Sequence, residues 1–217
     1  MKKKIGLLGG RFDPVHRAHL AMATSAANQL KLDEVRWIVT GKPVHKKTFA
    51  SAKQRLKMVS LALKDISDKR MLVDDIEVLS SLKGEPNPTY KTIEALKINH
   101  PGVKFLWILG EDQLANFQTW QNWEWLIENI EIGVCSRPNT SRVMQHSIRE
   151  REKNLFFKKN KKLIYIKMLP DECSSTKVRE FISKGKPTAS LITSSVEKYI
   201  LKNKLYINYE RENNFKS

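Results

Sequence analysis

The sequence predicts an α/β protein, with a doubly wound parallel sheet and a small helical part near the C-terminal end. Short apolar runs of strand length alternate with segments in which apolar residues recur at helical spacing. Such alternation is typical of βαβ units, whose consecutive strands run parallel. Two of the apolar runs end at glycine, and in this fold class ligands bind at the carboxyl ends of the strands. The chain has 217 residues, of which 41% are hydrophobic, so it can bury the core that this fold needs.

The first βαβ unit is expected at the N-terminal end. Residues 5–8 form an apolar run that stops at Gly9 and Gly10, which predicts a strand followed by a turn. Residues 19–32 carry apolar side chains at helical spacing, and residues 35–39 are again apolar and partly β-branched. Strand, turn, helix and strand thus follow one another as a parallel pair of strands requires.

The alternation continues as far as residue 167. The further elements expected are a helix at 51–66, a strand at 71–79, a helix at 90–98, a strand at 103–109 that ends at Gly110, a helix at 122–129, and strands at 130–135 and 163–167. Residues 139–162 are expected to form a peripheral amphipathic helix and a solvated basic loop. Two helices should then begin near Ser174 and near Thr188. We expect a single domain, 1–217, in which residues 171–217 form a helical subdomain.

Charge narrows the choice of partners. Lys and Arg number 39 against 23 Asp and Glu, a net charge of +16, so the protein should attract polyanions such as nucleotides or nucleic acids. The lysines are spread along the chain, which is more typical of a solvated surface than of a nucleic-acid site. A nucleic-acid-binding protein is the alternative, but it would need aromatic stacking positions among the basic residues or a recognisable reading module. The sequence has neither, and we expect no nucleic-acid partner.

Composition also bears on the compartment. The two cysteines, Cys135 and Cys173, form no CxxC pair, and the first residues do not resemble a signal peptide. We therefore expect a cytoplasmic protein without a disulfide framework. No apolar run approaches the roughly 20 residues needed to cross a bilayer, so no membrane contact is expected. The sequence leaves open whether the protein is a monomer or a homo-oligomer.

The first motif that could carry chemistry spans residues 9–19. Glycines at a strand end let the backbone approach a phosphate, and a helix N-terminus beyond them supplies free N–H groups. His16 and His19 are three residues apart, so both imidazoles would lie on nearly the same side of a first helical turn. They could stabilise charge on the α-phosphoryl oxygens and the departing pyrophosphate. A pair of surface or capping histidines is the alternative, whereas a zinc pair would be spaced four apart with Glu between.

The second motif, residues 173–179, places small hydroxyl residues just before a helix. Ser and Thr at such positions normally cap the helix by accepting its free N–H groups. Arg179 would follow one turn later as a fixed fork for β- and γ-phosphate oxygens. Capping and anion binding are compatible, so both interpretations stay open.

Both motifs carry a resemblance. GGRFDPVHRAH at 9–19 resembles the GGxFDPxHxGH signature of nucleotidyltransferases related to class I aminoacyl-tRNA synthetases, and SSTKVR at 174–179 resembles their SSTxIR signature. LGEDQLANFQTW at 109–120, followed by Arg137 and Pro138, resembles the GxDxLxxFxxW and RP segments of bacterial nicotinate-nucleotide adenylyltransferases.

The likeness covers nearly the whole chain. Residues 43–46 are similar to the PPHK element, residues 89–90 to the SYT element, and residues 196–206 to the terminal helix of that family. The departures are Arg11 where Thr is common, Ala18 where Gly is usual, Lys91 at or beside the expected Thr, and Cys173 for an apolar residue.

The resemblance implies a Rossmann-like nucleotidyltransferase fold and a reaction. The 5′-phosphate of nicotinate mononucleotide would attack the α-phosphorus of ATP, giving deamido-NAD and pyrophosphate without a covalent enzyme intermediate. One Mg²⁺ would be bound mainly by the ATP phosphates, with no ligand from protein side chains. The alternatives are nicotinamide mononucleotide or another phosphate acceptor, such as phosphopantetheine or flavin mononucleotide.

The resemblance also assigns residues. The catalytic group is His16, His19 and Arg179. The ATP-binding group is Gly9, Gly10, Phe12, Gly110, Asp112, Ser175 and Thr176. The group that binds nicotinate mononucleotide is His45, Lys46, Thr89, Tyr90, Lys91, Trp120, Gln121 and Arg137. Asp112 could instead cap a helix, and Lys46 and Arg137 could be ordinary surface charges.

Overall fold

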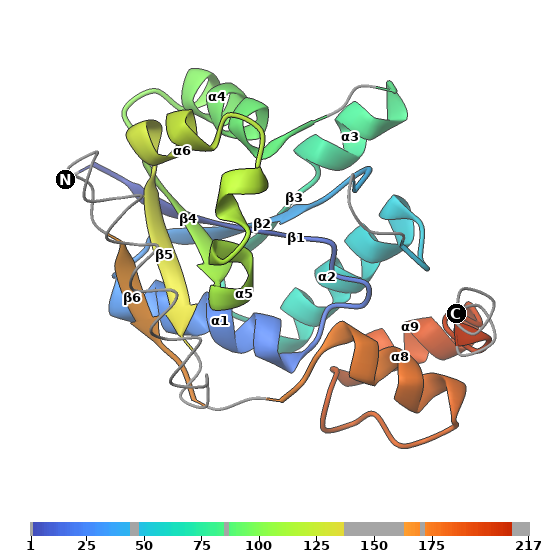
Figure 1. Cartoon of the computed structure of the whole chain (residues 1–217). Helices are drawn as coiled ribbons and strands as arrows, with labels where there is room; N and C mark the ends of the chain where they lie inside the picture. The colour runs from blue at the N-terminus through green and yellow to red at the C-terminus, as the bar shows by residue number, and fades with distance from the viewer. Residues whose placement is uncertain (1, 44–47, 85–86, 137–162, 170–171, 210–217) are drawn as a thin grey trace. The chain divides into compact units, whose positions relative to one another are not determined.

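The computed structural model describes residues 2–43, 48–84, 87–136, 163–169 and 172–209. Six strands form one sheet in the order β3-β2-β1-β4-β5-β6 (Figure 1). The strands are β1 (Lys4–Gly10), β2 (Glu34–Val39), β3 (Met71–Asp74), β4 (Lys104–Gly110), β5 (Glu131–Ser136) and β6 (Ile164–Lys167). β1 pairs parallel with β4, β4 with β5 and β5 with β6. This is the doubly wound α/β fold that the alternation of apolar runs and helical stripes predicts.

The helices follow the strands in the expected alternation. They are α1 (Arg17–Gln29), α2 (Ala52–Ile66), α3 (Ile76–Leu82), α4 (Thr89–Asn99), α5 (Glu111–Leu114), the short 3₁₀ helix η1 (Phe117–Thr119), α6 (Trp123–Asn129), α8 (Ser175–Ser183) and α9 (Ser194–Lys202). The amphipathic helix and basic loop predicted at 139–162 lie outside the described residues.

The chain divides into two compact units. Unit 1 contains Met1–Gly9, Met22–Arg36 and Pro86–Asp171, and unit 2 contains Gly10–Ala21, Trp37–Glu85 and Glu172–Ser217. The expectation of a single domain with residues 171–217 as a helical subdomain stays a prediction.

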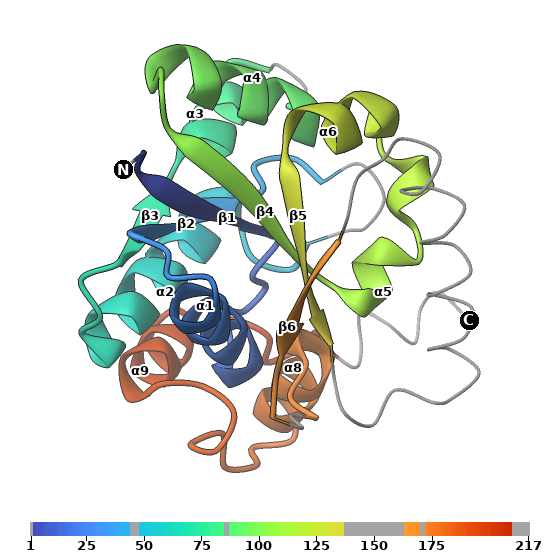
Figure 2. The same cartoon turned by 90° about the vertical axis from the view of Figure 1, so that its left-hand side faces the viewer.

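In unit 1, strands β4, β5 and β6 lie side by side, and α4 and α6 pack against each other (Figure 2). The side chain of Gln29, at the end of α1, joins β6 through two hydrogen bonds. Its Nε2 donates to the carbonyl oxygen of Lys167 at 2.8 Å, and its Oε1 accepts from the N–H of Lys167 at 3.0 Å.

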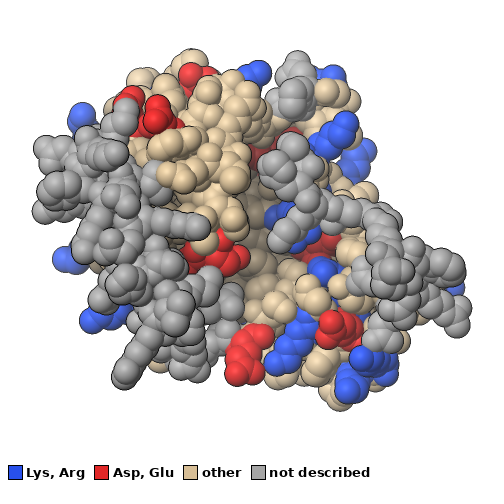
Figure 3. Space-filling view, in the orientation of Figure 1, with Lys and Arg blue, Asp and Glu red and all other residues tan. Residues whose placement is uncertain are grey.

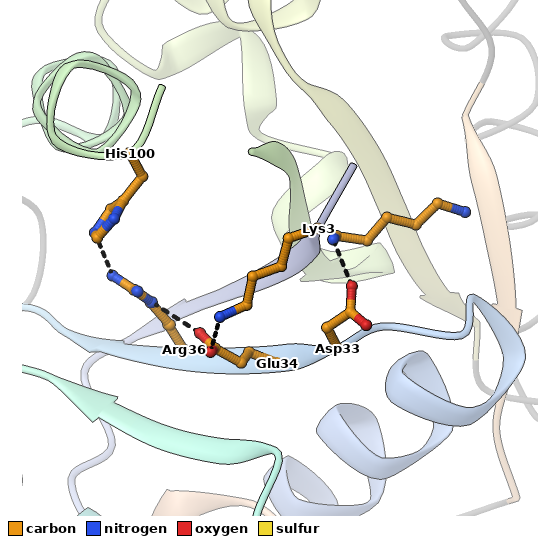
Figure 4. A network of polar contacts seen from close by, with 6 residues as sticks. Lys3, Asp33, Glu34, Arg36 and His100 are labelled. Atoms are coloured by element: carbon orange, nitrogen blue, oxygen red, sulfur yellow. Dashed lines mark hydrogen bonds and ion pairs between the residues drawn. The ribbon is translucent and has the colours of Figure 1, made fainter. Parts of the chain in front are cut away.

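A chain of polar contacts in unit 1 joins the first residues of β2 to neighbouring segments (Figure 4). Glu34 contacts the ammonium of Lys3, and Arg36 Nε lies 3.5 Å from the second carboxylate oxygen of Glu34. Arg36 Nη1 lies 3.0 Å from His100 Nε2, just before β4. The carboxylate of Asp33 accepts from the backbone N–H of Lys4 at 2.7 Å. These contacts lie at the amino ends of the strands, away from the carboxyl ends, where such folds bind ligands.

In unit 2, α2 packs against α9 and β3. Ser51 and Gln54 form a capping box at the start of α2, which satisfies two of the N–H groups that a helix start leaves free. The carboxylate of Asp65 accepts from the hydroxyl of Ser195 at 2.6 Å and from its N–H at 3.1 Å, and so joins the end of α2 to the first turn of α9.

Two expectations about elements are wrong. The extended segment predicted at 71–79 ends at Asp74, whose carboxylate accepts from the N–H of Ile76 at 3.1 Å where α3 begins. The β-branched residues of this segment favour a strand, but the local hydrogen bond turns the chain into a helix. The last helix begins at Ser194 and not near Thr188, because residues 188–192 form a single turn that buries Leu191 and Ile192.

Charged side chains of both signs are interspersed on the face of the protein shown in Figure 3. The basic run at 157–162 lies outside the described residues, so its part in nucleic-acid binding is untested. Within the described part of the chain, no helix combines the length and the apolar composition needed to span a membrane.

Candidate active site

The loop from Gly10 to His16 leads from β1 to α1 and belongs to unit 2. Phe12 is 2% exposed and has a positive φ of 50°, and its ring packs edge-on against His19, with 5.0 Å between ring centroids. A Cβ at Gly10 would lie 2.9 Å from Phe12 Cζ, so a larger residue there would displace that ring. Glycine is therefore required at this position by close packing.

His16 and His19 lie side by side, as their spacing predicts. Helix α1 begins directly after His16, whose carbonyl oxygen accepts from the N–H groups of His19 at 3.0 Å and Leu20 at 3.3 Å. The two imidazole centroids are 3.7 Å apart, and their planes differ by 31°. The backbone N–H of His16 donates to His19 Nδ1 at 3.3 Å, which assigns the ring proton of a neutral His19 to Nε2. His19 therefore keeps an N–H donor on the side of the ring away from its own backbone.

Asp13 connects this loop to other segments of the chain, although no role was predicted for it from the sequence. Its side chain is almost fully buried, and the carboxylate accepts three hydrogen bonds. The donors are the N–H of Phe49 at 2.7 Å, the N–H of Ala50 at 3.1 Å and the hydroxyl of Tyr206 at 2.7 Å. A buried carboxylate needs such donors to offset the loss of water, so the loop conformation depends on these partners.

The second motif joins the first through α8. Ser174 caps the helix by accepting from the N–H of Lys177 at 3.2 Å, as the default interpretation predicts. Ser175 then donates its hydroxyl to the carbonyl oxygen of Pro14 at 2.9 Å. Arg179 Nη1 donates to the carbonyl oxygen of Asp13 at 2.6 Å. Segments that lie far apart in the sequence are thus held together by direct hydrogen bonds within unit 2.

Arg179 is buried, unlike an arginine on the protein surface. It is 5% exposed, and its guanidinium lies 4.9 Å from the ring centroid of Phe49 and 4.6 Å from that of Tyr209. Its Nη2 donates to Thr176 Oγ1 at 3.0 Å and to the Tyr209 hydroxyl at 3.3 Å, whereas its Nε has no hydrogen-bond partner among the described residues. The aromatic contacts fix the plane of the fork and leave one N–H of it unused.

A second buried arginine supports the same loop. Arg55 on α2 is fully buried and donates to the carbonyl oxygens of Arg11 at 2.7 Å, Gly41 at 3.0 Å and Ala50 at 3.3 Å. Burial lowers the pKa of Arg55, and the charge of Asp13 acts in the opposite direction.

The electrostatic balance of this cluster is positive. Burial lowers the pKa of Arg11, the charge of Asp13 opposes this, and the charge of Arg179 lowers it further. The guanidinium groups of Arg11, Arg55 and Arg179 outnumber the carboxylates of Asp13 and Glu77 that act on them, and an excess of fixed positive charge suits the binding of phosphate oxygens.

Three of the predicted ATP-binding residues, Gly9, Gly110 and Asp112, lie in unit 1 near the carboxyl ends of β1 and β4. A Cβ at Gly9 would lie 2.3 Å from Trp107 Cζ2, so only glycine fits beside this indole. Gly110 takes the cap position before α5, and Asp112 is exposed in the first turn of that helix. The capping alternative for Asp112 is therefore wrong, because the cap is Gly110.

Five of the residues assigned to the pyridine nucleotide, Thr89, Tyr90, Lys91, Trp120 and Gln121, lie in segments of unit 1 that carry aromatic side chains, which we call the aromatic region. Thr89, Tyr90 and Lys91 make up the first turn of α4, where a helix leaves N–H groups without helical acceptors. The Tyr90 ring packs edge-on against Trp125 on α6, with centroids 6.2 Å apart.

Trp120, half-buried at the end of η1, contacts the rings of Phe117 at 5.1 Å and Trp107 at 6.3 Å between centroids. Gln121 is exposed beside it. His45, Lys46 and Arg137 lie outside the described residues, so their assignments stay predictions.

No group of three or more His, Cys, Asp or Glu side chains is placed to hold a metal ion in the described segments. The predicted Mg²⁺ does not depend on such a group, because magnesium commonly keeps water and substrate phosphates as most of its ligands.

Comparison with known proteins defines the class first. Residues 7–181 match the family model described as cytidylyltransferase-like, and this span includes both motifs. The chain is a nucleotidyltransferase of this class.

Two curated relatives define the family more closely. A protein of Bordetella petrii is 34% identical over 94% of this chain and 99% of its own length, and one of Clostridium tetani is 34% identical over 95% and 100%. Both bear the name "Probable nicotinate-nucleotide adenylyltransferase". The chain belongs to the nicotinate-nucleotide adenylyltransferase family.

A solved structure shares the fold. The nicotinic acid mononucleotide adenylyltransferase of Plasmodium falciparum, complexed with NaAD, aligns over 94% of this chain and 97% of its own with a TM-score of 0.75. The two sequences are 22% identical, so this likeness bears on the architecture alone.

Proposed function

We propose that the protein transfers the adenylyl group of ATP to nicotinate mononucleotide, giving deamido-NAD and pyrophosphate. The observation that carries the proposal is the junction of two distant motifs in unit 2. Arg179 and Ser175 of the second motif donate to carbonyl oxygens of Asp13 and Pro14, within the loop that ends at His16. The end-to-end similarity to named adenylyltransferases supports the choice of acceptor.

In the proposed mechanism the 5′-phosphate of nicotinate mononucleotide attacks the α-phosphorus of ATP in line, and pyrophosphate leaves. Nε2–H of His19 and the imidazole of His16 would stabilise charge on the α-phosphoryl and leaving oxygens. Ser175, Thr176 and Arg179 would bind the ATP phosphates. A bound Mg²⁺, held mainly by those phosphates, would neutralise part of their charge. No protein nucleophile is required, so positioning and charge stabilisation supply the rate.

The acceptor is assigned to the aromatic region of unit 1. Its pyridine ring would stack on Trp120, and N–H groups near residues 89–92 and 120–121 would bind its carboxylate. Gly110 and Asp112 would receive the adenosine ribose, since a carboxylate can accept from both hydroxyl groups. His45, Lys46 and Arg137 are proposed to approach the mononucleotide phosphate. We also propose that the enzyme works in the cytoplasm, where buried thiols such as those of Cys135 and Cys173 stay reduced.

One assay tests the reaction and the acceptor together. Pyrophosphate release from ATP is measured with nicotinate mononucleotide, nicotinamide mononucleotide and phosphopantetheine, each as the sole acceptor. We expect turnover with the first, weaker turnover with the second and none with the third. Exclusive use of phosphopantetheine would assign a different adenylyltransferase, and an oligonucleotide shift without any pyrophosphate release would favour a nucleic-acid-binding protein.

The catalytic role of the histidine pair has its own test. His19→Ala should lower kcat on the order of 10²–10³-fold, because it removes a donor aimed at developing charge. The matched control is His100→Ala, since His100 lies in the contact network of β2 and outside the proposed site. A His19→Ala variant with the kcat of the unmodified protein would remove His19 from catalysis.

A further inference from the structure

The turn that follows α9 supplies a hydrogen-bond partner to Asp13, which lies in the first motif. The sequence did not suggest this contact. Tyr206 is 7% exposed and has a positive φ of 64°, so its backbone is held in a conformation that few residues adopt freely. Its hydroxyl donates to Asp13 Oδ1 at 2.7 Å, across 193 positions of sequence. The same turn carries Tyr209, whose hydroxyl accepts from Arg179 at 3.3 Å.

Asp13 also forms hydrogen bonds with two other segments. Its carboxylate also accepts from the N–H groups of Phe49 and Ala50, just before α2, and its backbone oxygen accepts from Arg179 on α8. His16 follows Asp13 by three residues on the same loop. Removing the Tyr206 hydroxyl would leave one oxygen of this buried carboxylate with a weakened set of donors, and the loop would gain freedom to shift.

The donor itself is well suited to a permanent contact. Burial raises the pKa of Tyr206, and the nearby charge of Asp13 raises it further, so the phenol stays neutral and keeps its proton. The aromatic ring is enclosed by unit 2, and the hydroxyl also lies 4.0 Å from Met58 Sδ.

We propose that Tyr206 is a positioning residue for adenylyl transfer, which acts through Asp13 to hold the loop that carries His16. The proposal rests on the proposed function, because it concerns the rate of that reaction. Tyr206 would act without touching the substrates. Its effect belongs to kcat, since a donor displaced by a fraction of an ångström still permits ATP binding but fits the transition state poorly.

The first test compares Tyr206→Phe with Tyr199→Phe. Each variant loses one hydroxyl and keeps its ring, and Tyr199 lies on α9 outside the Asp13 network. Tyr206→Phe should lower kcat about 10- to 100-fold with KM for ATP changed by less than about threefold, and Tyr199→Phe should change neither. Thermal unfolding of both variants is measured alongside. A lower Tm for Tyr206→Phe with an unchanged kcat would show a purely structural role and overturn the proposal.

A double-mutant cycle tests whether Tyr206 acts through Asp13. In an Asp13→Ala background, Tyr206→Phe should lower kcat by less than about twofold further, because the acceptor of the Tyr206 hydroxyl is already gone. Two effects that multiply independently would overturn the route through Asp13.

Hydrogen exchange separates this proposal from the proposed function. Tyr206→Phe should speed amide exchange in peptides covering residues 10–16 and 49–50, and Tyr199→Phe should leave it unchanged. An unmodified protein without adenylyltransferase activity would contradict the proposed function, while unchanged exchange at both segments would overturn the role of Tyr206 in either case.

Discussion

Buried charged side chains hold the segments that surround the candidate site. Among the residues that the structure describes, no carboxylate forms a hydrogen bond with Arg55, whose guanidinium instead donates to three backbone carbonyl oxygens. Those carbonyls belong to the loop after β1, the segment after β2 and the residue before the cap of α2. One side chain therefore holds three irregular segments in register, and each of them would be left with an unsatisfied acceptor without it.

Arg55→Met should lower the free energy of unfolding by about 3 kcal/mol, because a similar volume replaces the stem while the buried carbonyls lose their donors. Urea unfolding followed by circular dichroism measures the change. The matched control is Arg70→Met, whose guanidinium pairs with Asp68 at 2.7 Å and is 35% exposed. The control should cost less than about 1 kcal/mol. Equal costs in the two variants would contradict the role given to Arg55.

Cys135 shows how burial silences a reactive group. Desolvation, and after it the charge of Glu111, raise the pKa of Cys135 to about 12. At pH 8 on the order of one molecule in ten thousand would carry the thiolate, which is the form that reacts. Iodoacetamide should therefore leave Cys135 unmodified in the folded protein and alkylate it after unfolding in guanidinium chloride, as mapped by peptide mass spectrometry. Rapid alkylation of the folded protein at pH 8 would contradict this environment.

The geometry of the candidate site was predictable from the sequence only where it depends on the local spacing of residues. The pairing of His16 with His19 follows from their separation by three residues and a helix start. The contacts of Asp13 and Arg179 could not be predicted from local spacing, because their partners are residues 49, 206 and 209. Tertiary contacts of this kind leave no periodic signal in the sequence.

At the scale of elements, apolar periodicity predicted the strands and most helices, because each buries one face in the core. It failed where local polar bonds decide the path of the chain. The carboxylate of Asp74 accepts from the N–H of Ile76 where α3 begins, inside a run of strand-forming residues. Thr188, expected near a helix start, is buried and uses its hydroxyl on Glu197, while α9 begins six positions later.

The contact network at the start of β2 predicts a pH dependence of stability. Burial acts to raise the pKa of Glu34, but the hydrogen bond and charge of Lys3, together with Arg36, outweigh it and leave the pKa below its usual range. A carboxylate with a lowered folded-state pKa stabilises the protein above the unfolded-state pKa, and this contribution disappears as pH falls through the folded-state value.

Glu34→Gln should therefore lower the free energy of unfolding by about 0.5–1 kcal/mol at pH 7, and the difference from the unmodified protein should shrink below about pH 4. Urea unfolding at the two pH values measures it. Glu131→Gln is the control, since Glu131 pairs with Lys104 at a more exposed position, 43% against 18% exposed. A difference for Glu34→Gln that grows as pH falls would contradict the sign.

At the scale of the whole molecule, one chain presents two kinds of recognition. Unit 2 gathers buried arginines, a histidine pair and helix α8, all suited to phosphates. Unit 1 gathers indole rings and the first turn of α4, suited to an aromatic ring with an anionic substituent. The sequence assigned both groups of residues through its motifs, whereas the division into two units and the packing of Trp107 against Gly9 and Trp120 needed the structure.

The proposed stacking on Trp120 would not distinguish nicotinate from nicotinamide mononucleotide, because the two rings have nearly the same shape. Discrimination must come from the substituent. A carboxylate offers two acceptors to nearby N–H groups, whereas an amide would turn its NH₂ toward one of those donors. An unsatisfied buried donor costs roughly 1–3 kcal/mol, which corresponds to a preference of at least about tenfold.

The proposed reaction and its specificity are tested most directly by the ratio of kcat/KM for nicotinate mononucleotide to that for nicotinamide mononucleotide, with ATP saturating. The dinucleotide product is identified by mass, and pyrophosphate is counted against it. We predict equal amounts of deamido-NAD and pyrophosphate and a ratio of at least about ten in favour of the acid. A ratio near one would contradict the proposed specificity, and pyrophosphate release without deamido-NAD would contradict the proposed reaction.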